Sequence, residues 1–392
     1  MGDLWLRNVR VSGRDAPTEI VIRDGRIDEV GATPERWQHR TVDAGGHLAL
    51  PGLVDGHAHV DKTLWGLPWR PHSAGAGLAA LIENERSGRR ELPPVAVRAA
   101  ALFEEYSAQG ATLIRTHVDI DLDNGITAVE GVLEAAQRYS DRLDVQVVAF
   151  PQSGMLVAPG TAELLDAAVA AGAALVGGID PAGLDGNAVE HLDVIFAIAE
   201  RHGCGVDLHL HDRGTLGRWQ LGLVVERTRV LGLQGRVTVS HAFCLCDGDP
   251  EVDPLLERLA EQRIGLATVA PGNVEPLPLA RIVELGIAVC LGQDGVRDLW
   301  SPWGDADMLS RAAQLAWRCG YRRDEEIELC VEIASSRGAA ALGVSDQVLA
   351  PGGRGDLVLV DAAVPAEAAV AHPPRSLVVK HGVPVARAGL ES

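Results

Sequence analysis

Short apolar runs and turn residues alternate over the first fifty positions of the chain. Residues 4–11, 18–23 and 26–31 each contain apolar or alternating apolar and polar positions, and glycines or an Asp-Gly pair separate them. A period of two is typical of strands, and Asp-Gly between two such runs is typical of a hairpin. The pattern predicts a β-rich N-terminal segment.

A different pattern begins near residue 52, where apolar strand-like segments alternate with long stretches rich in Ala, Leu, Arg and Glu. Strand and helix in regular alternation indicate a parallel sheet. Eight units predict a closed (β/α)8 TIM-type barrel rather than an open doubly wound sheet, because no G-x-G-x-x-G follows the first strand. The strand-like segments are residues 53–59, 112–118, 143–150, 174–179, 205–209, 236–241, 264–269 and 287–293.

Strand-like sequence returns after about residue 345, at residues 355–361 and 376–382. Two β-rich ends that flank one barrel are expected to pack together. We therefore expect a small discontinuous β-sandwich domain from residues 1–51 and 346–392, and a barrel domain from residues 52–345.

Composition narrows the range of partners. The net charge of −19 and the pI of about 5.1 argue against a nucleic acid, which needs a basic surface. No apolar run approaches the ~20 residues of a membrane span, and the N-terminus lacks the pattern of a secretory signal. The six cysteines lack the spacing of a disulfide framework. We expect a cytoplasmic protein with a small-molecule substrate, and the sequence leaves a homo-oligomer open.

Histidine and aspartate recur where the predicted barrel strands end. His57 and His59 alternate on one strand, so they share a face and can bind one ion, although such a pair can equally be two satisfied polar residues. His209, His241 and Asp294 end or follow three further strands. In a closed barrel these ends face one crevice. Three histidines and one carboxylate leave room for water, which indicates a catalytic rather than a structural metal site.

These motifs carry a resemblance to a known group of enzymes. The run LPGLVDGHAHVDK at residues 50–62 resembles the first-strand signature of the amidohydrolase superfamily. The segments FPQSGM (150–155), VDLHLHD (206–212), VSH (239–241) and LGQDG (291–295) resemble, in the same order, its cytosine deaminase branch. The match covers nearly the whole chain.

The resemblance implies a ligand set. His57, His59, His209 and Asp294 would hold one zinc or iron ion, and His241 would hydrogen-bond the metal-bound hydroxide. Two-metal members of the superfamily bridge their ions with a modified lysine from the fourth barrel strand. The lysines of this chain lie elsewhere, at positions 62 and 380, so we expect one ion per subunit.

The resemblance also implies substrate contacts. Gln152 would touch the substrate ring, and Asp212 would replace the proton-shuttling glutamate of the cytosine deaminase branch. Lys62, which follows the first predicted strand, adds a cation near the mouth of the predicted barrel. Trp303, in the loop after the eighth strand, would wall a flat heterocycle or belong to the core of its loop.

Departures from the cytosine deaminase pattern predict a different substrate from cytosine. Asp212 is one methylene shorter than glutamate. Where the branch has His-Asp-Asp, this chain has Gln293, Asp294 and Gly295, and so loses a second carboxylate. Lys62 is a third departure.

The fifth strand leaves one assignment open. By strict alternation His209 and His211 share a face whereas Asp212 does not, so Asp212 reaches a metal only if the strand ends or bulges near Leu210. The resemblance favours His209 as the ligand, and spacing alone permits His211.

The leading hypothesis is attack of a metal-bound hydroxide on an amidine-like ring carbon, which deaminates an amino-substituted nitrogen heterocycle. The alternative is hydrolysis of a cyclic amide or an N-substituted ring amine at the same site. A non-catalytic binding scaffold is the third possibility, and the retention of all four expected ligands together with His241 argues against it.

Overall fold

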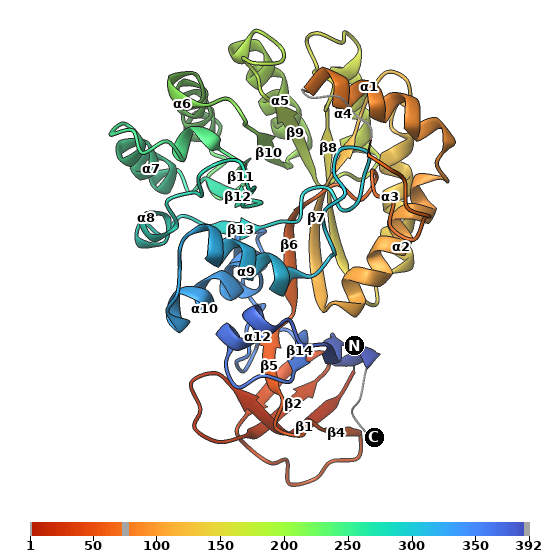
Figure 1. The fold of residues 1–392 in the computed structure, drawn as a ribbon, viewed down its shortest axis with the longest axis vertical. Coiled ribbons are helices and arrows are strands. Elements are labelled where there is room, and N and C mark those ends of the chain that lie inside the picture. Colours follow the sequence, from red (N-terminus) through yellow and green to blue (C-terminus); the bar gives the residue numbers. More distant parts are fainter. Residues whose placement is uncertain (1, 73–77, 388–392) are drawn as a thin grey trace.

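The computed structural model describes residues 2–72 and 78–387, and it consists of a parallel barrel above a smaller β-domain (Figure 1). Each barrel strand pairs in parallel with the next along the chain. A parallel bridge between Ala58 and Asp294 joins the last strand to the first. The strands are β6 (Leu53–Ala58), β7 (Ala111–Asp119), β8 (Asp144–Phe150), β9 (Leu175–Ile179), β10 (Gly205–His209), β11 (Val237–Ser240), β12 (Gly265–Thr268) and β13 (Val289–Leu291).

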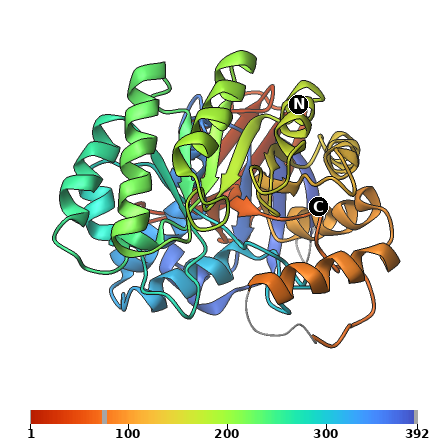
Figure 2. The same cartoon turned by 90° about the horizontal axis from the view of Figure 1, so that it is seen from above.

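Helices surround these strands, as the view from above shows (Figure 2). They are amphipathic: α7 buries Val252, Leu255, Leu256 and Leu259, which recur at helical spacing, in the barrel core. Among the described helices, none is both long and apolar enough to cross a lipid bilayer. The helices are α1 (Leu78–Gly88), α2 (Val95–Ala108), α3 (Thr127–Arg138), α4 (Thr161–Ala170), α5 (Ala188–His202), α6 (Gly214–Leu231), α7 (Val252–Glu261), α8 (Leu279–Glu284), α9 (Met308–Arg318), α10 (Asp324–Ile333), α11 (Ser336–Ala341) and α12 (Pro365–Ala371), with short 3₁₀ turns at Arg89–Glu91 and Phe243–Leu245.

The β-domain combines strands from both ends of the chain. The first half of β1 pairs with β2 and β4, its second half pairs with β5, and the register shifts between Leu6 and Val9. The C-terminal β14 then adds antiparallel to β5. Leu6, Ile22 and Leu359 meet in one apolar core between the two halves. The strands are β1 (Leu4–Val11), β2 (Thr18–Arg23), β3 (Arg26–Val30), β4 (Arg40–Asp43), β5 (Leu48–Pro51), β14 (Leu357–Val360), β15 (Arg375–Lys380) and β16 (Val383–Arg387).

The predicted fold class is confirmed: a (β/α)8 barrel carries a small β-domain built from both chain ends. Sequence patterns did not predict β4, β5 and β16, which have four or five residues each. Residues 1 and 388–392, which the expected small domain included, lie outside the described residues.

A buried lysine joins the β-domain to the barrel. The Lys380 side chain at the end of β15 is fully buried, and its ammonium donates to the Thr112 carbonyl of β7 at 3.1 Å. It also donates to the Asp144 carboxylate of β8 at 2.8 Å and to the buried Asp356 carboxylate at 2.7 Å. One cation therefore satisfies groups from both parts of the molecule.

Replacing Lys380 by Met should lower the free energy of unfolding by about 3–5 kcal/mol, because Asp356 would keep a buried charge without its partner. The exposed pair Arg142–Glu104, at 3.0 Å, provides the matched control. Arg142→Met should change the stability by about 0–1 kcal/mol. Urea unfolding followed by circular dichroism measures both stabilities. Equally small losses of stability in the two variants would contradict a stabilising role of Lys380.

Candidate active site

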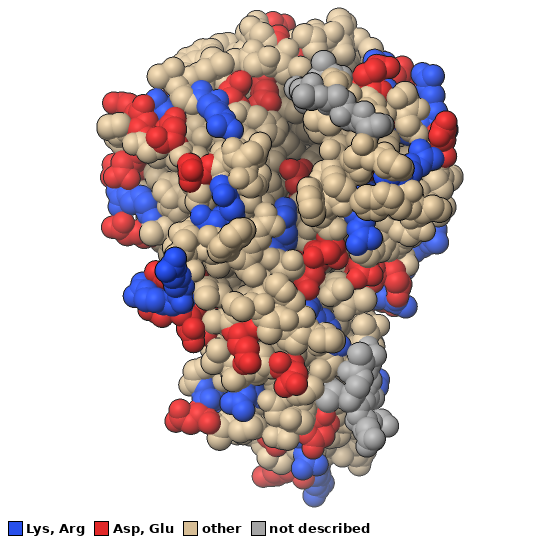
Figure 3. Space-filling view, viewed as in Figure 1, with Lys and Arg blue, Asp and Glu red and all other residues tan. Residues whose placement is uncertain are grey.

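A cavity of about 860 Å³ opens at the carboxyl ends of the barrel strands. The space-filling view shows a hollow in the barrel part of this face, with acidic and basic side chains interspersed around it (Figure 3). In parallel barrels this end is where reactive groups gather. The cavity wall includes His59, Lys62, Phe150, Gln152, Asp180, His209, His211, His241, Gln293, Asp294, Asp298, Trp300 and Trp303.

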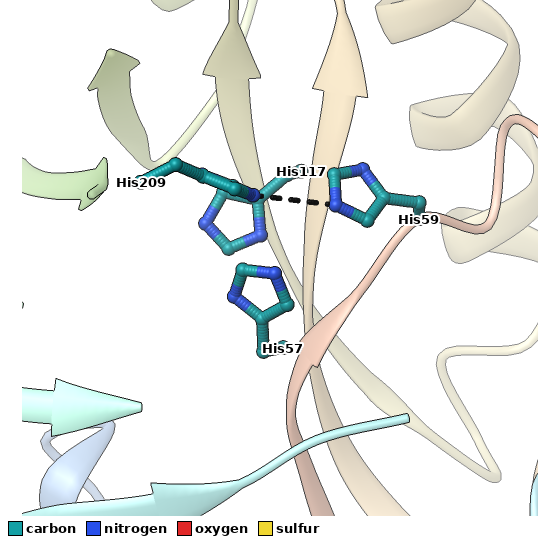
Figure 4. A group of neighbouring side chains, drawn as sticks. All are labelled: His57, His59, His117 and His209. Atoms are coloured by element: carbon teal, nitrogen blue, oxygen red, sulfur yellow. Dashed lines mark hydrogen bonds between the residues drawn. The ribbon is translucent and has the colours of Figure 1, made fainter. Parts of the chain in front are cut away.

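Histidine side chains converge at the floor of this cavity (Figure 4). Nε2 of His59 lies 3.3 Å from Nε2 of His209 and 3.3 Å from Oδ1 of Asp294. Nε2 of His57 lies 3.8 Å from the same carboxylate oxygen. Ligand atoms placed tetrahedrally at about 2.1 Å from a metal ion lie roughly 3.4 Å from one another. These three distances are close to the spacing expected of ligand atoms around one ion.

Hydrogen bonds on the side of the His57 ring that faces away from Asp294 fix its orientation. Its Nδ1 lies 2.9 Å from Oγ of Ser240, and Ser240 donates to Oδ1 of Asp207 at 2.7 Å. Because the serine proton is committed to Asp207, Nδ1 carries the imidazole proton and Nε2 carries the lone pair. Within the described part of the chain, this buried Nε2 has no hydrogen-bond partner. A metal ion suits such an atom.

Electrostatics favour neutral imidazoles in this group. Burial lowers the pKa of His57, His59 and His209 well below the ordinary histidine value, and the neighbouring histidines, with Lys62 beside His59, oppose a charge on any one of them. The pKa of His241 is lowered in the same way. Neutral imidazole is the form that binds a metal ion, so the donor set fits a cation without first losing protons.

The barrel seam places Asp294 beside the histidines. Its backbone N–H donates to the His57 carbonyl at 2.8 Å, and its carbonyl accepts from the His59 N–H at 3.2 Å. Asp294 has a φ of 66°, a conformation that is uncommon for a residue other than glycine. A Cβ at Gly292 would lie 2.5 Å from the Cβ of His57, so only glycine permits this approach.

His117 belongs to the same histidine group, and its ring also lies beside Asp207. Its ring centroid is 4.3 Å from that of His57, and its Nε2 lies 3.2 Å from Oδ1 of Asp207. Burial opposes the charge of Asp207, but His117 and Arg115 hold the pKa of Asp207 below its ordinary value. Arg115 donates to its other oxygen at 3.0 Å. His117 and Asp207 thus support the floor of the site.

The structure places the three expected substrate contacts on the cavity wall. Gln152 donates from Nε2 to Glu85 at 2.9 Å, and the Lys62 ammonium lies 3.7 Å from the same carboxylate oxygen. The Trp300 indole N–H also donates to Glu85. Trp303 lines the rim with 77% of its surface exposed.

Sequence reasoning missed Glu85, because it lies in a polar helical stretch that is typical of a solvated face. Neither composition nor periodicity distinguishes it from its neighbours in α1. Its role emerges only from long-range contacts with the loops that follow β8 and β13.

His211, and not Asp212, faces the cavity beyond β10. Nδ1 of His211 lies 2.8 Å from Oδ2 of Asp180, and its ring stacks on His241 with centroids 4.4 Å apart. The Asp212 carboxylate instead accepts from the Gly183 N–H and from the Gln220 side-chain amide, both at 2.9 Å. Asp212 is absent from the cavity wall.

Two of these positions bear on the sequence analysis. His209 lies in the converging group, and His211 lies outside it. Asp180 was missed, although it directly follows β9 and strand-end position could have identified it.

Relatives of known name match almost the full length of the chain. N-isopropylammelide isopropyl amidohydrolase of Pseudomonas sp. strain ADP is 32% identical over 97% of this chain and 96% of that protein. The crystal structure of N-isopropylammelide isopropylaminohydrolase from Burkholderia multivorans matches with a TM-score of 0.94 and 44% identity, over 99% of each chain.

A more distant structure shares the same architecture. The 5-methylcytosine deaminase of Klebsiella pneumoniae, liganded with phosphonocytosine, matches with a TM-score of 0.85 and 25% identity over 99% of each chain. The sequence profile of the amidohydrolase family matches residues 40–386, which span the barrel and strands on both sides of it. Since this profile covers most of the chain, the protein belongs to the amidohydrolase family.

Proposed function

We propose that this protein hydrolyses the bond between a ring carbon and an exocyclic nitrogen of a small heterocycle, releasing ammonia or an amine. The convergence of three imidazole nitrogens and the Asp294 carboxylate at the floor of the cavity carries the proposal. Two relatives named for N-isopropylammelide favour a ring with an N-alkylamino group, and the likeness to a deaminase favours a free amino group.

The proposed cofactor is one divalent ion, zinc or iron, held by His57, His59, His209 and Asp294. When bound there, the ion lowers the pKa of water to near 7 and polarises the bond under attack. A single ion is supported by the absence of lysine from β9, the fourth barrel strand, since such a lysine would be needed to bridge two ions.

His211 is the proposed proton carrier. Asp180 occupies its Nδ1, which leaves Nε2 for the cavity. Burial favours the neutral ring, but the hydrogen bond and the charge of Asp180 raise the pKa of His211 above the ordinary histidine value. A proton held at Nε2 can pass to the departing nitrogen, which makes that nitrogen a better leaving group.

Gln152 and Lys62 are the proposed anchors of the ring. Glu85 holds the amide nitrogen of Gln152, so the amide oxygen remains to accept a hydrogen bond from the substrate. The Lys62 ammonium lies over the Trp300 ring at 5.4 Å from its centroid and can donate to a ring carbonyl. These contacts orient the ring carbon toward the floor of the site.

A panel of ring substrates tests the reaction. Protein loaded with zinc or iron should release isopropylamine from N-isopropylammelide, or ammonia from one class among aminotriazines, aminopyrimidines and pterins. Chromatography measures the ring product and an amine assay measures the released amine or ammonia. The two products should form in equal amounts. Ring opening without a released amine would overturn the proposed reaction and favour cyclic amide hydrolysis.

Two neighbouring substitutions separate the proton carriers. His211→Asn should lower kcat about 100-fold or more, with KM changed much less, because it removes the proton at Nε2. Asp212→Asn, the matched variant one residue on, should lower kcat less than about 10-fold, since its carboxylate binds only backbone and Gln220. A larger loss of kcat in Asp212→Asn than in His211→Asn would indicate that Asp212 is the proton carrier.

Elemental analysis tests the ligand set. Wild-type protein should hold about one transition-metal ion per chain, and Asp294→Ala and His209→Ala should lose most of it. His117→Gln tests the fourth histidine of the group, which is not among the proposed ligands: because its Nε2 lies 3.2 Å from Asp207, this variant should retain the ion. Two ions per chain, or retention of metal by Asp294→Ala, would contradict the assignment.

A further inference from the structure

Gly295 directly follows Asp294 at a position where the cytosine deaminase pattern has a carboxylate. A Cβ built on Gly295 would overlap Oδ2 of Asp298. The backbone of Gly295 lies outside the left-handed region, so its conformation does not itself require glycine. Asp298 therefore occupies the space that a side chain at position 295 would need.

The loop after β13 holds the Asp298 carboxylate in one orientation. Oδ1 accepts from the backbone N–H groups of Trp300 at 2.8 Å and Ser301 at 2.7 Å. The Asp298 N–H donates to the Ser301 carbonyl at 2.9 Å, and the Arg297 N–H donates to the Trp303 carbonyl at 2.8 Å. These two backbone hydrogen bonds close the loop, so the Asp298 side chain has little conformational freedom.

The second carboxylate oxygen is available for a ligand. Asp298 is 3% exposed and lines the cavity, and Oδ2 has no hydrogen-bond partner among residues 2–72 and 78–387. Burial raises the pKa of Asp298 to about 6, and the loop N–H groups and Lys62 limit the rise. At neutral pH this oxygen is an ionised acceptor, which is costly to leave unpaired.

A buried donor shares this part of the wall. Lys62 lines the same cavity, and its ammonium and the Asp298 carboxylate attract each other electrostatically. The two side chains thus offer a donor and an acceptor beside the Trp300 ring, over which the Lys62 ammonium lies. A planar ring edge with a carbonyl next to an N–H is complementary to this pair, because the carbonyl accepts from Lys62 and the N–H donates to Asp298.

We propose that Asp298 is a specificity-determining residue, whose carboxylate reaches over Gly295 to accept a ring N–H while Lys62 donates to the adjacent ring carbonyl. The inference rests on the proposed function and deepens it. It restricts the substrates to heterocycles with a lactam or imide edge. It also gives a reason for Gly295, because the acceptor lost at that position is supplied from the loop.

Binding of inert rings tests this role separately from turnover. The probes are uracil, which is neutral at pH 7 and carries N–H beside C=O, and 1,3-dimethyluracil, which has the carbonyls without the N–H. Calorimetry on metal-loaded wild-type protein should show uracil bound about 10- to 100-fold more tightly, as expected for a hydrogen bond to a charged acceptor.

Variants at two positions identify the acceptor. Asp298→Asn keeps an oxygen for the two loop N–H groups but replaces Oδ2 by an NH₂ donor, so the preference for uracil should disappear while the melting temperature holds. Gly295→Ala should also remove the preference by displacing Asp298, and it should cause no further loss in an Asp298→Ala background. Asp123→Asn, an exposed carboxylate paired with Arg86, is the matched control and should leave both affinities unchanged.

Each outcome counts for or against the proposal. Equal binding of the two rings to wild type, no binding of either ring, or an unchanged preference in Asp298→Asn would overturn the role of Asp298. If an aminoheterocycle were still hydrolysed in that case, the proposed function would stand. A ring preference that depends on Asp298, without hydrolysis of any substrate, would instead support the subsite and contradict the reaction.

Discussion

The barrel closes where the Asp294 N–H donates to the His57 carbonyl at 2.8 Å, and the geometry of the site depends on this contact. It joins the first and last barrel strands, so a carboxylate and two histidines that are more than two hundred residues apart meet at one point. The contact needs glycine at position 292, because any side chain there would collide with His57. The contact that closes the barrel therefore also brings the proposed ligands together.

Groups buried beneath this seam hold the site ready for a cation. Asp207, fully buried, accepts from Ser240 and Arg115, and Ser240 in turn fixes the tautomer of His57. The buried Nε2 atom of His57 has no hydrogen-bond partner in the described part of the chain, and the Nε2 atoms of His59 and His209 face each other at 3.3 Å. A buried set of unpaired lone pairs costs stability, and this cost is typical of sites organised for binding and not for folding alone.

Much of the fold follows from sequence patterns, because strands buried on both faces are continuous apolar runs with polar residues at their ends. The ends of all eight barrel strands lie within two residues of the predicted ends, and the largest difference is at β13 (Val289–Leu291), which is two residues shorter at each end than its predicted segment. The strand-end rule also brought the proposed ligands together. Asp212, which the resemblance and not the strand-end rule put forward, lies outside the cavity wall: β10 ends at His209, and the Asp212 carboxylate accepts from the Gly183 N–H and the Gln220 amide.

Residues on loops could not be predicted in the same way. Glu85 contacts a residue far away in the sequence, and Asp298 is held by the fold of its own loop, whereas their local sequences look like solvated helix and turn. The identity of Gly295 acquires a physical reason only when Asp298 is seen above it.

The most direct test of the metal site is anomalous diffraction from a crystal of the metal-loaded protein, recorded on both sides of the absorption edge. The account predicts one peak per chain, at about 2.0–2.2 Å from Nε2 of His57, His59 and His209 and from a carboxylate oxygen of Asp294. A second peak, or a single peak bound by His117 or His211 in place of one of these residues, would contradict it.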